Sequence, residues 1–244
     1  MIVTFTDFGV SGPYLGQVKA VLHRLAPGVP VVDLIADAPA FDPRSSAYLL
    51  AALARDFPAG TIFLGVVDPG VGGERGAVVV EVDGRRFVGP DNGLFEPVMR
   101  QGVKLRGWEI EWRPKTLSAT FHGRDLFAPV AAQLACGANP GAAGCVSASP
   151  PRRPDWPDDL AAVVYVDRFG NAITGTRAAT LPPDALIEIG GRRLAAARTF
   201  GDVAAGTAFW YENSSGLIEF AVNGGRADSV LGIGIGSVFD RVPS

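Results

Sequence analysis

Residues 61–70 read TIFLGVVDPG, a near-continuous apolar run that stops at an aspartate followed by proline and glycine. Apolar runs without polar alternation are typical of strands in a parallel sheet that is covered on both faces. The Asp-Pro-Gly that follows is a turn signal. We therefore predict an interior strand over residues 61–67, with Asp68 just beyond its carboxyl end.

Apolar patterns around this run alternate between strand and helix through the first 145 residues. Asp42 followed by Pro43 is typical of a helix start, and Asp83-Gly84 is typical of a two-residue hairpin. The patterns predict strands at 2–5, 30–35, 61–67, 77–82 and 85–88, and helices at 14–25, 42–55 and 126–134. We expect residues 1–147 to form an α/β domain, an open, mostly parallel sheet with helices on both faces.

The character of the chain changes at residues 148–160, which are rich in proline and unsuited to joining a sheet. After this segment the pattern is nearly all strand, interrupted by Gly, Asn and Asp turns. The strands are predicted at 162–166, 185–189, 192–195, 208–211, 217–222 and 237–242. We expect a linker over residues 148–160 and a small all-β barrel over residues 161–244.

Charge and hydropathy narrow the class of partner. The net charge is −3 and no basic run exceeds an arginine pair, so no nucleic-acid partner is expected. No apolar run approaches the ~20 residues of a membrane span, and the first residues read as a strand, not as an export signal. We expect a cytoplasmic protein without membrane contact, in which Cys136 and Cys145 are free, buried thiols.

Polar residues gather where the predicted strands end. Asp7 follows the first strand, Asp68 the third, Asp91 the hairpin, and His122 precedes the last helix. Ligands of open α/β sheets bind outside the carboxyl ends of the strands, so these segments are expected to converge on one crevice. Each of these polar residues also has a simpler interpretation. Asp7 could cap a helix, and Asp68 and Asp91 could only form turns. Arg75 could be a solvated cation, and His122 could have a structural role.

Six ordered segments resemble the S-adenosylmethionine hydroxide adenosyltransferases, hydrolytic relatives of the fluorinase and chlorinase. The segments are Thr6–Gly9, Asp68–Gly72, Gly89–Leu94, Phe121–Asp125, Asp167–Asn171 and Asn213–Gly216. The resemblance covers both predicted domains. It implies an N-terminal α/β domain, a C-terminal β-barrel and a homotrimer. It also implies S-adenosylmethionine as the substrate, active sites between neighbouring subunits, and no cofactor or metal.

The resemblance also implies a role for particular residues. Asp68, Arg75 and His122 fall where the family handles the attacking water. Phe8 is among those implied to bind the substrate. The others are Asp7 at the ribose hydroxyls, Phe41 near the ribose, Asp167, Ser214 and Ser215 at the methionine end, and Phe169 and Asn171 at the adenine. Where halogenases carry an aromatic residue, this chain has Asp68, and where they carry an arginine, it has Ser215. Both departures favour water over halide.

The chemistry that we hypothesise for these residues needs no covalent intermediate, because a sulfonium is already a good leaving group. Asp68 would accept a proton from the water, directly or through His122, and Arg75 would orient that water. Asp7 can accept two hydrogen bonds from a ribose diol, and Phe169 can stack on a purine. An acidic, aromatic site with Asp68 and Phe41 would suit the cationic sulfonium.

Three other functions fit parts of the pattern. Asp7, Asp68, Asp91, Asn92 and His122 are ligand types for the two-metal site of a phosphoesterase, although such sites usually use several histidines. A protein that only binds S-adenosylmethionine would need the pocket without the three water-handling residues. A chlorinase would remain within the same family. We take hydrolysis as the leading hypothesis.

Overall fold

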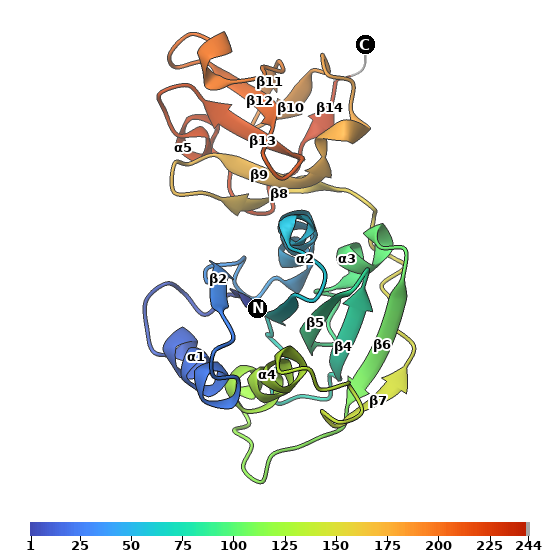
Figure 1. Ribbon diagram of the computed structural model, residues 1–244. Helices are drawn as coiled ribbons and strands as arrows, with labels where there is room; N and C mark the ends of the chain where they lie inside the picture. The colour runs from blue at the N-terminus through green and yellow to red at the C-terminus, as the bar shows by residue number, and fades with distance from the viewer. Residues whose placement is uncertain (243–244) are drawn as a thin grey trace. The chain divides into compact units, whose positions relative to one another are not determined.

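The computed structural model describes residues 1–242, which fall into two compact units, Met1–Asp155 and residues 156–242 (Figure 1). Each unit has its own sheet system and its own apolar core. No helix within the described residues is long and apolar enough to span a membrane.

The first unit is built on a seven-stranded sheet in the order β2-β1-β3-β5-β4-β6-β7. Its strands are β1 (Ile2–Thr6), β2 (Val31–Ile35), β3 (Ile62–Val66), β4 (Ala77–Val82), β5 (Arg85–Pro90), β6 (Leu105–Ile110) and β7 (Cys145–Ala148). β2, β1, β3 and β5 run parallel, whereas β4, β6 and β7 each pair antiparallel with their neighbours. The mostly parallel sheet is confirmed, and so is the antiparallel β4–β5 hairpin, whereas the further antiparallel strands β6 and β7 were not predicted.

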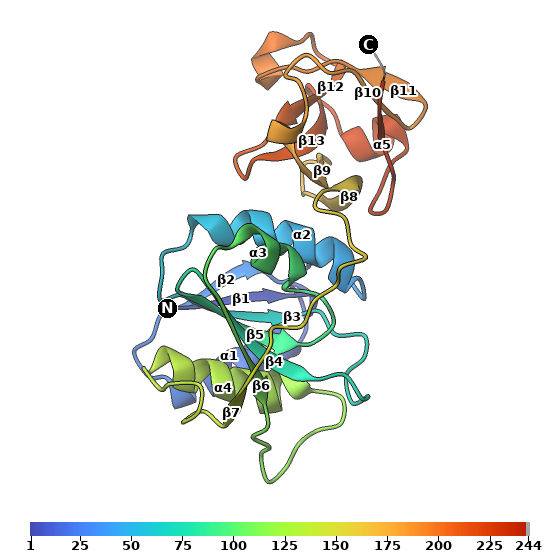
Figure 2. The ribbon, with the colours of Figure 1, turned by 90° about the vertical axis from the view of Figure 1, so that its right-hand side faces the viewer.

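Helices cover both faces of this sheet, as predicted. α1 (Tyr14–Leu25) and α4 (Ala128–Ala135) pack together on one face, and α2 (Pro43–Leu53) and α3 (Glu96–Gln101) on the other (Figure 2). A short 3-10 turn, Ala54–Asp56, extends α2. Because both faces are covered, every residue of β3 is buried.

Local signals in the sequence correspond to the structure at two places in this unit. The Asp42 carboxylate accepts a hydrogen bond from the Ser45 amide at 3.0 Å and caps α2, with Pro43 at the first helical position. Asp83 and Gly84 both have positive φ, 49° and 83°, as the turn between β4 and β5 requires. The helix predicted at 126–134 begins earlier, with a π turn over Gly123–Phe127 that leads into α4.

Residues 150–155, in the predicted linker, lie in the first unit. Glu96 on α3 is 1% exposed and forms ion pairs with Arg100 and Arg152. The same carboxylate accepts a hydrogen bond from the Arg153 amide at 2.8 Å. This proline-rich stretch is therefore anchored to α3 by hydrogen bonds and ion pairs.

The second unit consists of two antiparallel sheets, in the orders β12-β13-β9-β8 and β11-β10-β14. Its strands are β8 (Leu160–Val166), β9 (Ala172–Arg177), β10 (Ile187–Ile189), β11 (Arg192–Leu194), β12 (Ala208–Glu212), β13 (Leu217–Val222) and β14 (Asp240–Arg241). Helix α5 (Ala227–Leu231) and 3-10 turns at Ala178–Thr180 and Phe200–Asp202 complete it. The all-β character is confirmed apart from α5, whereas closure into a barrel stays a prediction.

The two cysteines differ in their surroundings. Both are free, as predicted, but Cys136 is exposed, so its predicted burial is wrong. Cys145, at the start of β7, is buried, and this burial raises the pKa of its thiol to about 11. Cys136 lies just beyond the last turn of α4, where the chain leaves the helix.

Candidate active site

A small hollow of about 60 Å³ lies beyond the carboxyl ends of β1 and β3 in the first unit. Its walls come from three of the four polar segments noted in the sequence, and the lining residues are Asp7, Phe8, Val66, Asp68, Val71, Thr120, Phe121, His122 and Gly123. The fourth segment, residues 91–93, does not line it. Its Asn92 side chain instead hydrogen-bonds to the Val67 carbonyl at 2.8 Å.

Arg75 contacts both Asp68 and His122 beside this hollow. Arg75 donates from Nη2 to Asp68 Oδ2 at 2.5 Å and to His122 Nδ1 at 2.9 Å, and from Nε to Asp68 Oδ1 at 3.0 Å. The side chains of Arg75 and Asp68 are only 12% and 5% exposed. Arg75 is therefore not the solvated cation of the simpler reading.

The hydrogen bond to Arg75 determines the proton arrangement of His122. A guanidinium has donors only, so Nδ1 must accept, and the proton of a neutral imidazole then resides on Nε2. The pKa of His122 is lowered, first by burial and next by the Arg75 charge, with Asp68 opposing in part. His122 is therefore a neutral imidazole at pH 7 with Nε2–H as its donor.

Asp7 forms another part of the wall. Its Oδ2 accepts a hydrogen bond from the Phe41 amide at 3.2 Å. Burial raises the pKa of Asp7, the Asp68 charge adds to this, and the Phe41 hydrogen bond opposes it. The N-cap of α1 is Pro13, without a side-chain cap, so Asp7 does not cap this helix.

Phe41 lies next to Asp7 in an unusual conformation. Its φ of 59° is left-handed, which costs a side-chain-bearing residue about 1–2 kcal/mol. The residue is 79% exposed. A strained backbone that presents an exposed ring beside a half-buried carboxylate is typical of a ligand site.

Aromatic rings also surround the hollow. Phe121 meets Phe8 and Tyr14 edge to face, with ring centroids 5.8 and 5.5 Å apart. A Cβ on Gly123 would lie 2.9 Å from the Phe8 ring, so the start of the helix can approach Phe8 only because this residue is glycine. Tyr14 opens the helix predicted over residues 14–25, and its ring contact with Phe121 joins segments far apart in the chain, so it has no local signal in the sequence.

The predicted residues of the second unit fall on two loops. In the first, Asp167 Oδ1 accepts from the Phe169 and Asn171 amides, both at 2.9 Å, and Oδ2 accepts from Asn171 Nδ2 at 3.1 Å. The carboxylate thus shapes its own loop. Gly170 has a φ of 85°, and Phe169 is left 74% exposed.

The second loop, Asn213–Gly216, follows β12. Asn213 Oδ1 accepts from the Ser215 amide at 2.9 Å, and Asn213 Nδ2 donates to Glu219 Oε2 at 2.9 Å. Tyr211 donates to the other oxygen of Glu219, whose pKa is raised by burial. This buried network was not predicted, although an acidic residue within the otherwise apolar run 217–222 is a signal for it in the sequence.

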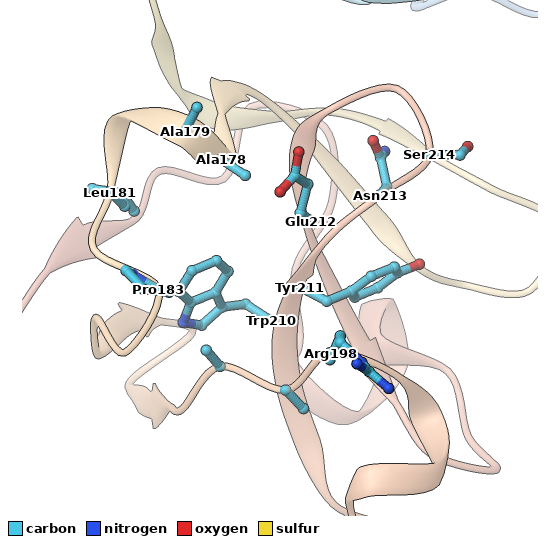
Figure 3. Close-up of a pocket in the computed structure, with 12 residues that line it drawn as sticks. Ala178, Ala179, Leu181, Pro183, Arg198, Trp210, Tyr211, Glu212, Asn213 and Ser214 are labelled. Atoms are coloured by element: carbon cyan, nitrogen blue, oxygen red, sulfur yellow. The ribbon is translucent and has the colours of Figure 1, made fainter.

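A larger hollow, about 690 Å³, lies beside this loop in the second unit. Figure 3 shows Trp210 and Tyr211 leaving β12 on opposite sides, as successive strand residues do. Of the predicted site residues only Ser214 lines this hollow. Within residues 1–242, no group of three or more His, Cys, Asp and Glu side chains is arranged to hold a metal ion.

The fold and the cluster together define a two-unit α/β protein with an acid, a guanidinium and an imidazole at the ends of parallel strands. Residues 2–144 match the family model of the SAM hydroxide adenosyltransferase N-terminal domain, and residues 161–240 match that of the C-terminal domain. The chain belongs to the SAM hydroxide adenosyltransferase family.

Curated relatives carry names that agree with this assignment, and a solved structure shares the fold. An (R)-S-adenosyl-L-methionine hydrolase from Thermus thermophilus is 42% identical, over 93% of this chain and 94% of that protein. One from Salinispora tropica is 39% identical, over 93% and 92%. A fluorinase from Nocardia brasiliensis is more distant, 24% identical over 56% and 54%. The crystal structure of an uncharacterized conserved protein from Thermotoga maritima has a TM-score of 0.90 at 32% identity, with full coverage of both chains.

The lowered pKa of His122 predicts how stability depends on pH. The unfolded chain binds a proton at His122 near pH 6.5, whereas the folded chain binds it only at lower pH. This contribution to the free energy of unfolding is therefore present above pH 6.5 and is lost as the pH falls. We expect the fall in stability between pH 7 and 5 to be smaller in His122→Gln, measured by urea unfolding. An NMR titration that places the His122 pKa at or above 6.5 would contradict this.

Proposed function

We propose that this protein hydrolyses S-adenosyl-L-methionine to adenosine and L-methionine. The observation that carries the proposal is the hydrogen-bonded contact of Asp68, Arg75 and His122 beside a hollow at the strand ends. Relatives that match more than nine-tenths of the chain are named (R)-S-adenosyl-L-methionine hydrolase. Family membership favours this reading over a phosphoesterase and over a binding-only protein.

The reaction that we propose is an in-line displacement at the ribose 5′ carbon. A hollow of about 60 Å³ is large enough to hold the attacking water. Water forms the new carbon–oxygen bond, the carbon–sulfur bond breaks, and the sulfur keeps the electron pair as the neutral thioether of methionine. Positioning contributes much of the acceleration, because the leaving group is already cationic.

Asp68 takes the proton of that water in this scheme. The direct route is favoured over a relay through His122, because His122 Nδ1 already accepts from Arg75. His122 Nε2–H would instead donate to the water oxygen and orient it. Arg75 would stabilise the developing negative charge. No metal or cofactor enters the scheme.

Asp7 would accept hydrogen bonds from both ribose hydroxyls, with Phe8 and Phe41 against the sugar. We assign Asp167, Ser214 and Ser215 to the methionine end, and Phe169 and Asn171 to the adenine. Support comes from the exposed rings of Phe41 and Phe169, both of which are available to a ligand.

We propose further that the active form is a homotrimer with each site shared between two subunits. Pockets for ligands of this size measure about 300–1,000 Å³, and the hollow at Asp68 measures about 60 Å³. A second surface is therefore needed to enclose the substrate. We also propose that the two sheets of the second unit close into the barrel typical of this family.

Asp68→Asn and His122→Ala test the proposed chemistry. We expect each to lower kcat for adenosine release by about 10²–10⁴-fold, because proton transfer and water orientation are lost. Asp56→Asn is the matched control: this exposed aspartate lies just before β3, away from its carboxyl end, and should retain full activity. Near-normal rates in both site variants, measured by chromatography of adenosine, would remove the proposed roles.

Asp7→Asn tests the grip on the ribose. Hydrogen bonds to a charged group contribute about 1.5–3 kcal/mol each, so adenosine should bind about 10–100-fold more weakly to the variant. The comparison ligand is 2′,3′-dideoxyadenosine, which lacks both hydroxyls and should bind the variant and the wild type alike. Calorimetric titration measures both, and an equal loss for the two ligands would place Asp7 elsewhere.

Mixed trimers test the shared site. Asp68→Asn inactivates the half of each site that the first unit contributes. Phe169→Asp inactivates the half that the second unit contributes. Trimers refolded from an equal mixture of the two chains should recover about a quarter of the wild-type rate, because one site in four combines two intact halves. Sites contained within one subunit would give no recovery.

A further inference from the structure

The turn at Asp91 and Asn92, after β5, holds the loop that carries Asp68 and Arg75. Asn92 Nδ2 donates to the Val67 carbonyl at 2.8 Å, immediately before Asp68. Asn92 Oδ1 accepts from the Leu94 amide at 3.2 Å, so both polar groups of this amide side chain are used. The start of the loop is thereby fixed to the end of β5.

The same turn also holds the far end of the loop. The Asp91 amide donates to the Gly76 carbonyl at 3.0 Å, and Arg75 Nη1 donates to that carbonyl at 3.3 Å. A Cβ on Gly76 would lie 3.3 Å from Asp91 Cβ, so a side chain there would press the two segments apart. The chain from Val67 to Gly76 is thus closed at both ends by two adjacent residues.

Arg153 in turn holds Asp91, the first residue of this turn, by hydrogen bonds. Its Nη2 donates to Asp91 Oδ1 at 3.1 Å and to the Asp91 carbonyl at 3.3 Å. Its own backbone is held on both sides, by Glu96 at the amide and by Arg100 Nη2 at the carbonyl, 2.6 Å away. Burial alone would raise the pKa of Glu96, but the hydrogen bonds from Arg152, Arg100 and the Arg153 amide lower it, so the anchor is a carboxylate.

We propose that Asn92 is a positioning residue for hydrolysis, and that Arg153 supports it through Asp91. Asn92 would not contact the substrate but would hold Asp68 and Arg75 in register with His122. The inference rests on the proposed function. A displacement of about 1 Å in a reacting group can cost about 10²-fold in rate, so the hydrogen bond to Val67 has a catalytic consequence.

Asn92→Ala tests the proposal against a matched control. Asn223 makes the same kind of contact in the second unit, from Nδ2 to the Val203 carbonyl at 2.7 Å. We expect Asn92→Ala to lower kcat by about 10–100-fold with little change in KM, and Asn223→Ala to leave kcat within about twofold. Equal kcat losses in the two variants, or a change confined to KM, would overturn the proposal.

Arg153→Gln covers the case in which Asn92→Ala does not fold. The Arg153–Asp91 pair is partly exposed, so its loss should lower kcat by only about two- to fivefold, again without a change in KM. An unchanged kcat in this folded variant would contradict the support that Arg153 is proposed to give.

NMR of the histidine rings separates this inference from the proposed function. The chain has two histidines, so ring nitrogen signals are assigned with a single His23→Ala variant. We expect the wild type to show His122 protonated at Nε2, and Asn92→Ala to show a mixture of tautomers, because Arg75 no longer holds Nδ1. An unchanged His122 signal in Asn92→Ala would overturn the positioning role. Wild-type protein that releases no adenosine would refute the proposed function while leaving this measurement valid.

Discussion

One guanidinium, that of Arg75, holds the candidate site together. It neutralises a nearly buried carboxylate at Asp68, whose isolated charge would otherwise cost several kcal/mol, and it simultaneously determines which nitrogen of His122 carries the proton. Asp68 and His122 come from segments far apart in the chain, and the Arg75 guanidinium links them by contacting both. Its planar fork makes both contacts at once, which a lysine could not reproduce with the same geometry.

The fold supplies the frame for that guanidinium. Parallel strands end at one edge of the sheet, so the residues after β1 and β3 meet beside the start of the helix that follows His122. Close approach of these segments requires glycine at Gly123, against Phe8, and at Gly72, against the Ala119 carbonyl. The parallel strand β5, next to β3, adds the turn that closes the loop carrying Asp68 and Arg75. Strands without a candidate site residue thus help to hold in place the segments that carry the candidate site residues.

The elements that were predicted correctly have strong local signals. The apolar run of β3, the Asp42 cap and the Asp83-Gly84 hairpin each depend on a few consecutive residues. β6, β7 and β9 were not predicted, because their sequences, LRGWEI, CVSA and AITGTR, mix glycine, polar and charged residues with apolar ones. Those strands form because neighbouring strands pair with them, and propensity is overridden by that pairing. The crevice at the strand ends was anticipated from where the polar residues fall, whereas the roles of its residues came from the family resemblance.

Composition and spacing alone established the α/β first part, the strand-rich second part and the segments that carry the chemistry, since caps, turns and periodicity act over a few residues. Spatial packing alone decided the rest. Arg75 reaches His122 across 47 positions, and Arg153 reaches Asp91 across 62. Residues 91–93 were expected to line the crevice, but packing places them where they support the loop that carries Asp68 and Arg75. Such contacts have no local signature, because hydrogen-bond partners are chosen by which surfaces the sheet and its helices bring within about 3 Å.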